Sequence, residues 1–240
     1  MIRALLLDLD GTLLQNDLET FTPVYFRALS GAVAPHADPG SFLSALGRGV
    51  QAMVGSRDRE TSNAEVFWAA AEPHLSAPRE ALEPVLTQFY DEGFGALSHV
   101  TQPVAGAGEL VAAARAAGLA LAVATQPMMP RRAILHRLAW AGLDPQAFAL
   151  ITCFETMHST KPHPSYFLEA AERLGCAPEA CLMAGNDLAD DLVGAQAAGM
   201  RTFFVDTFPA SATAPDSAPK FAPDARGSLA DLRRYLFGDG

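Results

Sequence analysis

The stretch LDLDGTL, residues 7–13, closes a short apolar run that begins at Ile2. An apolar run of this length that ends in acids and glycine is typical of a buried parallel strand opening into a loop. Asp8 and Asp10 stand two residues apart, so in an extended chain their carboxylates leave the strand end toward the same side. Gly11 then allows the backbone to turn away. The stretch predicts a pair of carboxylates at the tip of the first strand.

After this strand, the spacing of apolar residues follows one pattern in the first part of the chain and another in the rest. From about Leu18 to Ser98, apolar residues recur at three- and four-residue steps, with prolines and glycines where helices begin and end. After this stretch, strand-like apolar runs alternate with helical segments, and that alternation predicts a parallel sheet covered by helices on both faces. We therefore expect an α/β fold of the Rossmann-like kind, formed by residues 1–14 and 100–240, with an all-helical insert at residues 15–99.

The expected strands are residues 2–9, 119–125, 149–153, 180–184 and 202–205. The expected helices are residues 21–33, 42–54, 64–75, 79–94, 109–117, 131–141, 164–174, 189–198 and 228–236. Residues 208–226 contain four prolines, so we expect an irregular surface loop there.

Chemically active side chains stand at further strand ends. Thr125 ends one expected strand, Lys161 lies in a proline-stiffened loop, and the acidic stretch GNDLADD (residues 185–191) follows another strand. Reactive groups gather at the carboxyl ends of strands in an open parallel sheet. Asp187 and Asp191 are four residues apart, so one helical turn brings them close, and such like charges are unfavourable without a nearby cation. Each segment alone has an ordinary structural explanation: Thr125 could simply end a strand, Lys161 could be a surface lysine, and the acids could cap a helix. These explanations do not account for all the segments together.

The four segments, in this order, resemble the four motifs of the haloacid dehalogenase (HAD) superfamily. The helical insert directly after the first motif resembles a C1-type cap by its placement. The resemblance implies that Asp8 is a nucleophile, that Asp10 is a general acid and base, and that Asp191 holds Lys161. It further implies that Thr125, Gln126 and Lys161 bind the phosphoryl group. Mg²⁺ is the implied cofactor, with Asp8, the carbonyl of Asp10 and Asp187 as its ligands.

Charge counting supports a metal ion at such a site. Asp8, Asp10, Asp187, Asp191 and a phosphate dianion would bring together more negative charge than Lys161 can offset. An acid at position 10 also favours phosphate esters, because the dehalogenase branch of the family needs no leaving-group acid and lacks one there. We therefore expect a Mg²⁺-dependent phosphatase acting on a small phosphorylated metabolite. A phosphomutase and a non-catalytic binding protein of the same fold are the alternatives.

The composition of the chain indicates which binding partners and which cellular compartment to expect. The 240 residues carry a formal net charge of −10, which disfavours nucleic acid and anionic membrane surfaces. Three cysteines and no apolar leader favour a reduced, cytoplasmic protein, and we expect a monomer or homodimer. Cys153, His158 and His163 match no zinc spacing. Four arginines of the helical insert could contact an anionic part of the substrate: Arg27, Arg48, Arg57 and Arg59.

Overall fold

The predicted parallel sheet is confirmed in the computed structural model, which describes residues 1–207 and 222–238. Its strands are β1 (Ala4–Leu7), β4 (Ala120–Val123), β5 (Leu150–Ile151), β6 (Cys181–Gly185), β7 (Arg201–Val205) and β8 (Ala225–Gly227). They lie in the order β5-β4-β1-β6-β7-β8, and each neighbouring pair runs parallel. β1 therefore occupies the middle of the sheet, with β4 and β6 on its two sides.

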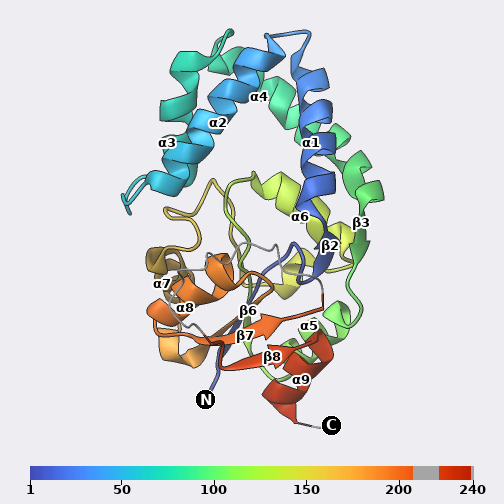
Figure 1. Ribbon diagram of the computed structural model, residues 1–240, viewed down its shortest axis with the longest axis vertical. Helices are drawn as coiled ribbons and strands as arrows, with labels where there is room; N and C mark the ends of the chain where they lie inside the picture. The colour runs from blue at the N-terminus through green and yellow to red at the C-terminus, as the bar shows by residue number, and fades with distance from the viewer. Residues whose placement is uncertain (208–221, 239–240) are drawn as a thin grey trace.

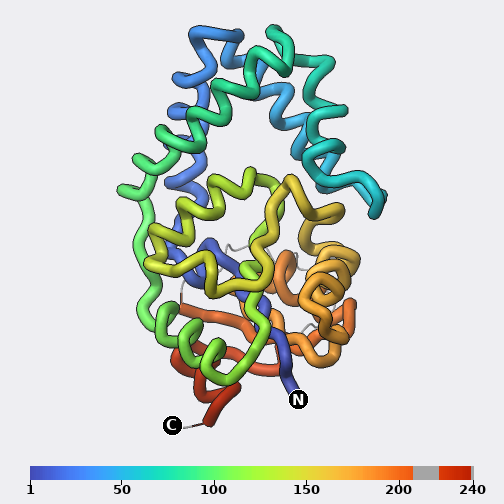
Figure 2. The backbone as a smooth tube through the Cα atoms, turned by 180° about the vertical axis from the view of Figure 1, so that it is seen from behind, coloured from blue at the N-terminus to red at the C-terminus, as the bar shows by residue number. Residues whose placement is uncertain are grey.

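Helices cover both faces of this sheet, as Figures 1 and 2 show. One face carries α5 (Ala107–Ala116), α6 (Arg131–Trp140) and α9 (Leu229–Phe237). The other carries α7 (Pro164–Arg173), the π-helical turn η6 (Leu188–Val193) and α8 (Gly194–Ala197). Two 3₁₀ turns, η4 (Pro145–Ala147) and η5 (Pro178–Ala180), precede β5 and β6.

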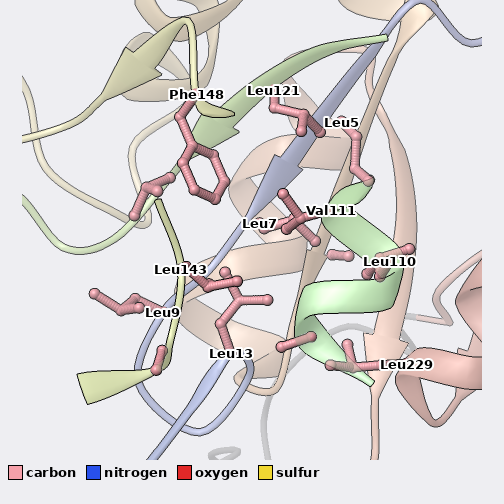
Figure 3. Packing of buried hydrophobic residues seen from close by; sticks show 14 of the residues in the cluster. Leu5, Leu7, Leu9, Leu13, Leu110, Val111, Leu121, Leu143, Phe148 and Leu229 are labelled. Atoms are coloured by element: carbon pink, nitrogen blue, oxygen red, sulfur yellow. The ribbon is translucent and has the colours of Figure 1, made fainter. Parts of the chain in front are cut away.

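The apolar run of β1 is explained by burial on both sides. Leu5 and Leu7 pack into a cluster with residues of α5, α6 and α9 (Figure 3). Ala4 and Leu6 point to the opposite face, into the cluster that contains Phe167 of α7. Because all four strand residues are fully buried, the strand has no polar alternation, as expected for a central parallel strand.

The helical insert forms a separate layer of helices beyond the end of β1, at one end of the molecule (Figure 1). The expectation of helices without strands between residues 18 and 98 is confirmed. The elements are α1 (Leu18–Val33), α2 (Pro39–Gly55), α3 (Asn63–Ala71), η1 (Glu72–His74), α4 (Arg79–Gln88), η2 (Phe89–Gly93) and η3 (Phe94–Val100). Its apolar centre includes Phe94, whose ring stacks on Trp140 of α6 with centroids 5.3 Å apart, so the insert shares packing with the sheet layer.

Polar side chains set the starts of these helices. Asp17 and Asp38 accept hydrogen bonds from the first free N–H groups of α1 and α2. Ser62 and Glu65 form a reciprocal capping box at the start of α3. Such caps satisfy donors that have no partner within the helix and therefore fix where it begins.

Two local expectations need correction. The insert is joined to the sheet layer by a two-stranded antiparallel pair, β2 (Leu14–Asn16) and β3 (Thr101–Pro103), which was not expected. The loop expected over residues 208–226 is wrong at its end, where β8 pairs with β7; residues 208–221 lie outside the described residues. β8 contains no β-branched or aromatic residue, so main-chain pairing rather than side-chain preference forms it.

Candidate active site

Three strand ends meet at the middle of the sheet, because β4 and β6 are the two neighbours of β1. Asp8 follows β1 directly, Thr125 lies two residues beyond β4, and Asn186 and Asp187 follow β6. The chain crosses from one side of β1 to the other between β5 and β6. A switch of this kind is where open α/β sheets bind ligands. The fold thus brings the separate sequence segments to one place.

Lys161 links two acids of these segments. Its Nζ donates to Asp8 Oδ1 at 2.7 Å and to Asp191 Oδ1 at 2.6 Å. All three residues are buried, with exposed fractions of 2% for Lys161, 2% for Asp191 and 7% for Asp8. Buried charges are costly unless each has a partner. One ammonium group shared by two carboxylates leaves this buried group with a net negative charge.

This imbalance changes the pKa values of the group. Burial raises the pKa of Asp8 to about 7, and the Asp191 carboxylate adds to the rise, while Lys161 offsets part of it. Burial alone would lower the pKa of Lys161, but Asp191 and Asp8 raise it above its ordinary value. Lys161 therefore stays protonated, whereas Asp8 is readily neutralised near pH 7 unless more positive charge is added.

Gln126 fixes the loop that carries Lys161. Its Nε2 donates to the Lys161 carbonyl at 3.1 Å, and its Oε1 accepts from the Lys161 N–H at 2.9 Å. Both polar ends of the amide are therefore engaged by the main chain. The Gln126 side chain therefore places Lys161, and the expected contact between Gln126 and the phosphoryl group stays a prediction.

Thr125 is held at a fixed position by its own carbonyl. That oxygen accepts from the Thr152 hydroxyl at 2.8 Å and from the Tyr166 hydroxyl at 2.9 Å. Tyr166 lies in the first turn of α7, just after the Lys161 loop, and is fully buried. The ends of β4 and β5 and the start of α7 are therefore tied together behind Thr125.

The acidic loop after β6 is wound tightly around its own carboxylates. Asp187 Oδ1 accepts from the N–H groups of Ala189 and Asp190 at 2.8 and 2.9 Å. Asp191 Oδ2 accepts from the Asp187 N–H at 3.0 Å. A Cβ at Gly185 would overlap the Asp191 carboxylate, so glycine is needed there. The two acids four residues apart are brought together, as expected, but through main-chain bonds.

The turn after Asp10 packs against this acidic loop. Gly11 has a φ of 81°, and a Cβ there would overlap the Asn186 amide. The Thr12 hydroxyl lies 3.3 Å from both Asp8 Oδ2 and Asn186 Oδ1. The first and last motifs therefore form one packed unit.

Asp10 has two partners that sequence reasoning did not single out. Asn16 Nδ2 donates to Asp10 Oδ1 at 2.9 Å, and the Arg137 guanidinium pairs with Asp10 Oδ2. Arg137 is only 4% exposed. A signal was present in the sequence, because Arg137 shares the apolar face of its helix with Ile134 and Leu138. Arginine is seldom buried in such a stripe without a partner.

Several oxygens of this site are suited to a divalent cation. In the described residues, no three His, Cys, Asp or Glu side chains converge on one point, but the implied set needs only two carboxylates and a carbonyl. Over the same residues, the second oxygen of Asp187 accepts no hydrogen bond, and the Asp10 carbonyl accepts none from the main chain. Hard oxygen donors of this kind suit Mg²⁺. Held by these oxygens and Asp8, Mg²⁺ would add the positive charge that Lys161 alone does not supply.

The helical insert contacts the loop that leads to Lys161. Asn63 begins α3 and is fully buried. Its Nδ2 donates to the Ser159 carbonyl at 3.1 Å and to the Pro127 carbonyl at 3.4 Å, and its N–H donates to Met157 at 2.7 Å. The insert therefore reaches the site from the side opposite to its β2–β3 connection (Figure 1).

Among the described residues, the remaining candidates make no hydrogen bond or ion pair with Asp8, Lys161 or Asp191. The four arginines of the insert are exposed: Arg27, Arg48, Arg57 and Arg59. Cys153, His158 and His163 have separate partners, namely the Thr156 hydroxyl, the Glu169 carboxylate and the Val54 carbonyl. Across residues 1–207 and 222–238, no helix combines the length and apolarity that a bilayer crossing requires.

The sequence matches a known protein family and several named relatives. Residues 2–199 match the haloacid dehalogenase-like hydrolase family. The chain is 29% identical over 199 residues to the phosphoglycolate phosphatase of Xylella fastidiosa (strain 9a5c), spanning 82% of this chain and 77% of that protein. It is 30% identical over 192 residues to the N-acetylmuramic acid 6-phosphate phosphatase of Pseudomonas aeruginosa, spanning 79% and 75% of the two chains.

A solved structure from this family has a similar fold. The crystal structure of a HAD phosphatase from Thermococcus onnurineus matches with a TM-score of 0.58 and 21% identity, covering 99% of each chain. The resemblance read from the four motifs is therefore confirmed: the chain belongs to the haloacid dehalogenase-like hydrolase family and is an enzyme of its phosphatase branch.

Proposed function

We propose that this protein is a Mg²⁺-dependent phosphatase that hydrolyses a small phosphorylated metabolite through an aspartyl-phosphate on Asp8. The observation that carries the proposal is the buried arrangement of Asp8, Lys161 and Asp191, in which Lys161 Nζ lies 2.7 Å and 2.6 Å from the two carboxylates. A nucleophilic carboxylate needs a fixed direction and partial charge compensation, and this arrangement supplies both.

In the first step, a carboxylate oxygen of Asp8 attacks phosphorus as the bond between phosphorus and the leaving oxygen breaks. Lys161 directs Asp8 and offsets charge on the phosphoryl oxygens, while Asp191 holds Lys161. Thr125, at the neighbouring strand end, donates its hydroxyl to a phosphoryl oxygen. Asp8, Asp187 and the Asp10 carbonyl would hold Mg²⁺, which when bound would supply charge neutralisation and alignment of the phosphoryl group.

Asp10 manages the proton in both steps. It gives a proton to the departing alkoxide, which leaves as an alcohol. In the second step it takes a proton from the water that attacks the aspartyl-phosphate, so inorganic phosphate leaves and the Asp8 carboxylate is restored. General acid and base help of this kind contributes about 10²–10⁴-fold in rate, and it is the feature that separates ester hydrolysis from carbon–halogen cleavage.

The substrate class follows from the relatives and the insert. Two relatives are named for phosphoglycolate and N-acetylmuramic acid 6-phosphate, both small phosphorylated compounds. We propose that residues 15–99 act as a cap over the core formed by residues 1–14 and 100–240. The contact of Asn63 with the loop before Lys161 supports this proposal, because a cap held at that loop would exclude water and contact the leaving group.

The test is phosphate release by the wild type and by Asp8→Asn, with Mg²⁺, from 4-nitrophenyl phosphate and from a panel of phosphorylated metabolites. We expect the variant to lose turnover by at least about 10⁴-fold while keeping its circular dichroism spectrum. Asp144→Asn is the matched control, because Asp144 is an exposed helix cap far along the chain, which asparagine replaces well. Wild-type activity in Asp8→Asn would refute the nucleophile assignment.

A further inference from the structure

Arg137 is a buried cation that none of the four motifs contains. It lies on α6, is 4% exposed, and pairs through Nη1 with Asp10 Oδ2. Its Nη2 approaches Met129 Sδ at 3.4 Å, and its Nε has no hydrogen-bond partner among the described residues. The ion pair with Asp10 is therefore the polar contact that compensates its charge.

The Asp10 carboxylate is fixed from both of its oxygens. Arg137 holds Oδ2, and Asn16 Nδ2 holds Oδ1 at 2.9 Å. Asn16 is the last residue of β2, and Arg137 comes from α6, so two separate elements converge on one carboxylate. A carboxylate that accepts hydrogen bonds at both oxygens has little freedom to rotate. Hydrogen bonds that involve a charged group are also stronger than those between neutral groups.

Lys161 and Arg137 form ion pairs with different acids of the site. Lys161 pairs with Asp8 and Asp191, whereas Arg137 pairs with Asp10. Asp10 is close enough to Asp8 for its charge to raise the pKa of Asp8. Without Arg137, the Asp10 carboxylate would lose its charged partner and keep only the hydrogen bond from Asn16 to one of its oxygens.

Arg137 also faces the helical insert. Tyr25 of α1 and Tyr90 of η2 share a hydrogen bond of 2.8 Å between their hydroxyls. Burial raises the pKa of both hydroxyls, and the charge of Arg137 lowers both in part, so the guanidinium lies near this pair. Arg137 therefore stands where the insert, β2 and the sheet layer meet.

We propose that Arg137 is a positioning residue for the reaction: together with Asn16, it fixes the Asp10 carboxylate in the orientation from which Asp10 exchanges a proton with the leaving-group oxygen. The inference rests on the proposed function, because it assigns Asp10 the proton transfer to that oxygen. It predicts a dependence on the leaving group. An alkyl phosphate needs the proton, whereas 4-nitrophenolate leaves readily without it.

The experiment compares kcat and KM for 4-nitrophenyl phosphate and for a simple alkyl phosphate, with Mg²⁺, in Arg137→Met, Arg137→Lys and Asp10→Asn. We expect Arg137→Met to lose at least about 100-fold in kcat/KM on the alkyl ester and less than about 5-fold on the aryl ester. The ratio kcat/KM is compared because it covers the steps up to the aspartyl-phosphate and leaves out its hydrolysis, in which Asp10 serves both esters alike. Arg137→Lys should recover part of the alkyl activity, because it keeps the charge. The double variant Asp10→Asn/Arg137→Met should be no slower than Asp10→Asn alone.

Arg132→Met is the matched control, since Arg132 is on the same helix, is half exposed, and pairs with Asp91 of the insert. It should leave the ratio between the two esters unchanged. Equal losses in kcat/KM on both esters in Arg137→Met, or losses that add to those of Asp10→Asn, would overturn the proposal and leave Arg137 a structural residue.

A thermal-unfolding cycle on the same variants provides a readout without turnover. If Arg137 and Asp10 are coupled, the double variant should lose less in Tm than the sum of the single losses, and additive losses would overturn the contact itself. A wild type that hydrolyses neither ester would refute the proposed function and the proton-placing role with it, whereas the failure patterns above occur in an active wild type. The two failures are therefore distinguishable.

Discussion

The Asn63 side-chain amide donates to the carbonyl of Ser159 at 3.1 Å, two residues before Lys161. Asn63 belongs to the helical insert and Ser159 to the sheet layer, and Asn63 is fully buried. A polar contact of this kind, removed from water, costs free energy when its donor is lost. The seating of the insert is thus tied to the loop that supplies the site's lysine.

Replacing the Asn63 amide should weaken the contact between the insert and the sheet layer and so lower the stability of the protein. We expect Asn63→Ala to lower the free energy of unfolding by about 1–3 kcal/mol, because two buried carbonyls lose their donor. Asn63→Asp should cost more, since it turns a carboxylate toward those carbonyls. Urea denaturation measures both, with Gln51→Ala on the exposed side of α2 as the control. Equal stability of Asn63→Ala and the wild type would show that the contact contributes nothing.

The raised pKa of Asp8 predicts a stability that depends on pH. The folded protein holds this proton up to about pH 7, whereas the unfolded chain releases it near 3.9. In metal-free buffer, the free energy of unfolding should therefore fall as pH rises from about 4 to 7. Asp8→Asn removes this titration, so above pH 7 the variant should be more stable than the wild type, by on the order of a few kcal/mol. Parallel pH curves for the two proteins would contradict the expectation.

Metal removal should abolish turnover. We expect EDTA to stop phosphate release and Mg²⁺ to restore it, because the buried acids otherwise repel the phosphate dianion. Asp187→Asn should raise the Mg²⁺ concentration needed for half-maximal activity by at least about 10-fold. Asp190→Asn, in the same loop, serves as the control. Hydrolysis that persists in EDTA would refute the charge argument.

The aromatic contact between the insert and α6 should be a main source of stability. Phe94 is fully buried and stacks on Trp140. We expect Phe94→Ala to cost about 3–5 kcal/mol, the usual range for a buried phenylalanine. Phe237→Ala, at a site 37% exposed, should cost far less. Chemical denaturation followed by circular dichroism compares the two, and similar losses would show that the cluster is not a packing centre.

The features that could be predicted from sequence are those that follow from chain direction. The order of the segments alone places Asp8, Thr125 and Asp187 together, because parallel strands that alternate with helices all end at one edge of a sheet. The helical insert was predictable from periodicity and from its prolines and glycines. Residue roles at the site remain predictions that the variants above test.

The features that were missed depend on contacts between distant segments. Nothing local in Asn16 or Arg137 says that both grip Asp10, because they come from β2 and α6. The two bonds between the Gln126 side-chain amide and the Lys161 main chain were likewise missed, because they join segments 35 residues apart. β8 was missed because pairing with β7, rather than its own residues, makes it a strand.

The antiparallel pair β2–β3 sets Asn16 opposite Thr101, so the chain departs for the insert and returns at adjacent points. A two-residue Asn-Gly turn could join those residues, because such turns suit antiparallel ladders. The resulting minimal enzyme would omit residues 17–100 yet preserve the path of the chain through the sheet. The same junction is a point at which the insert could be exchanged for another, provided that the new one restores the contacts that Asn63 and Phe94 make with the sheet layer.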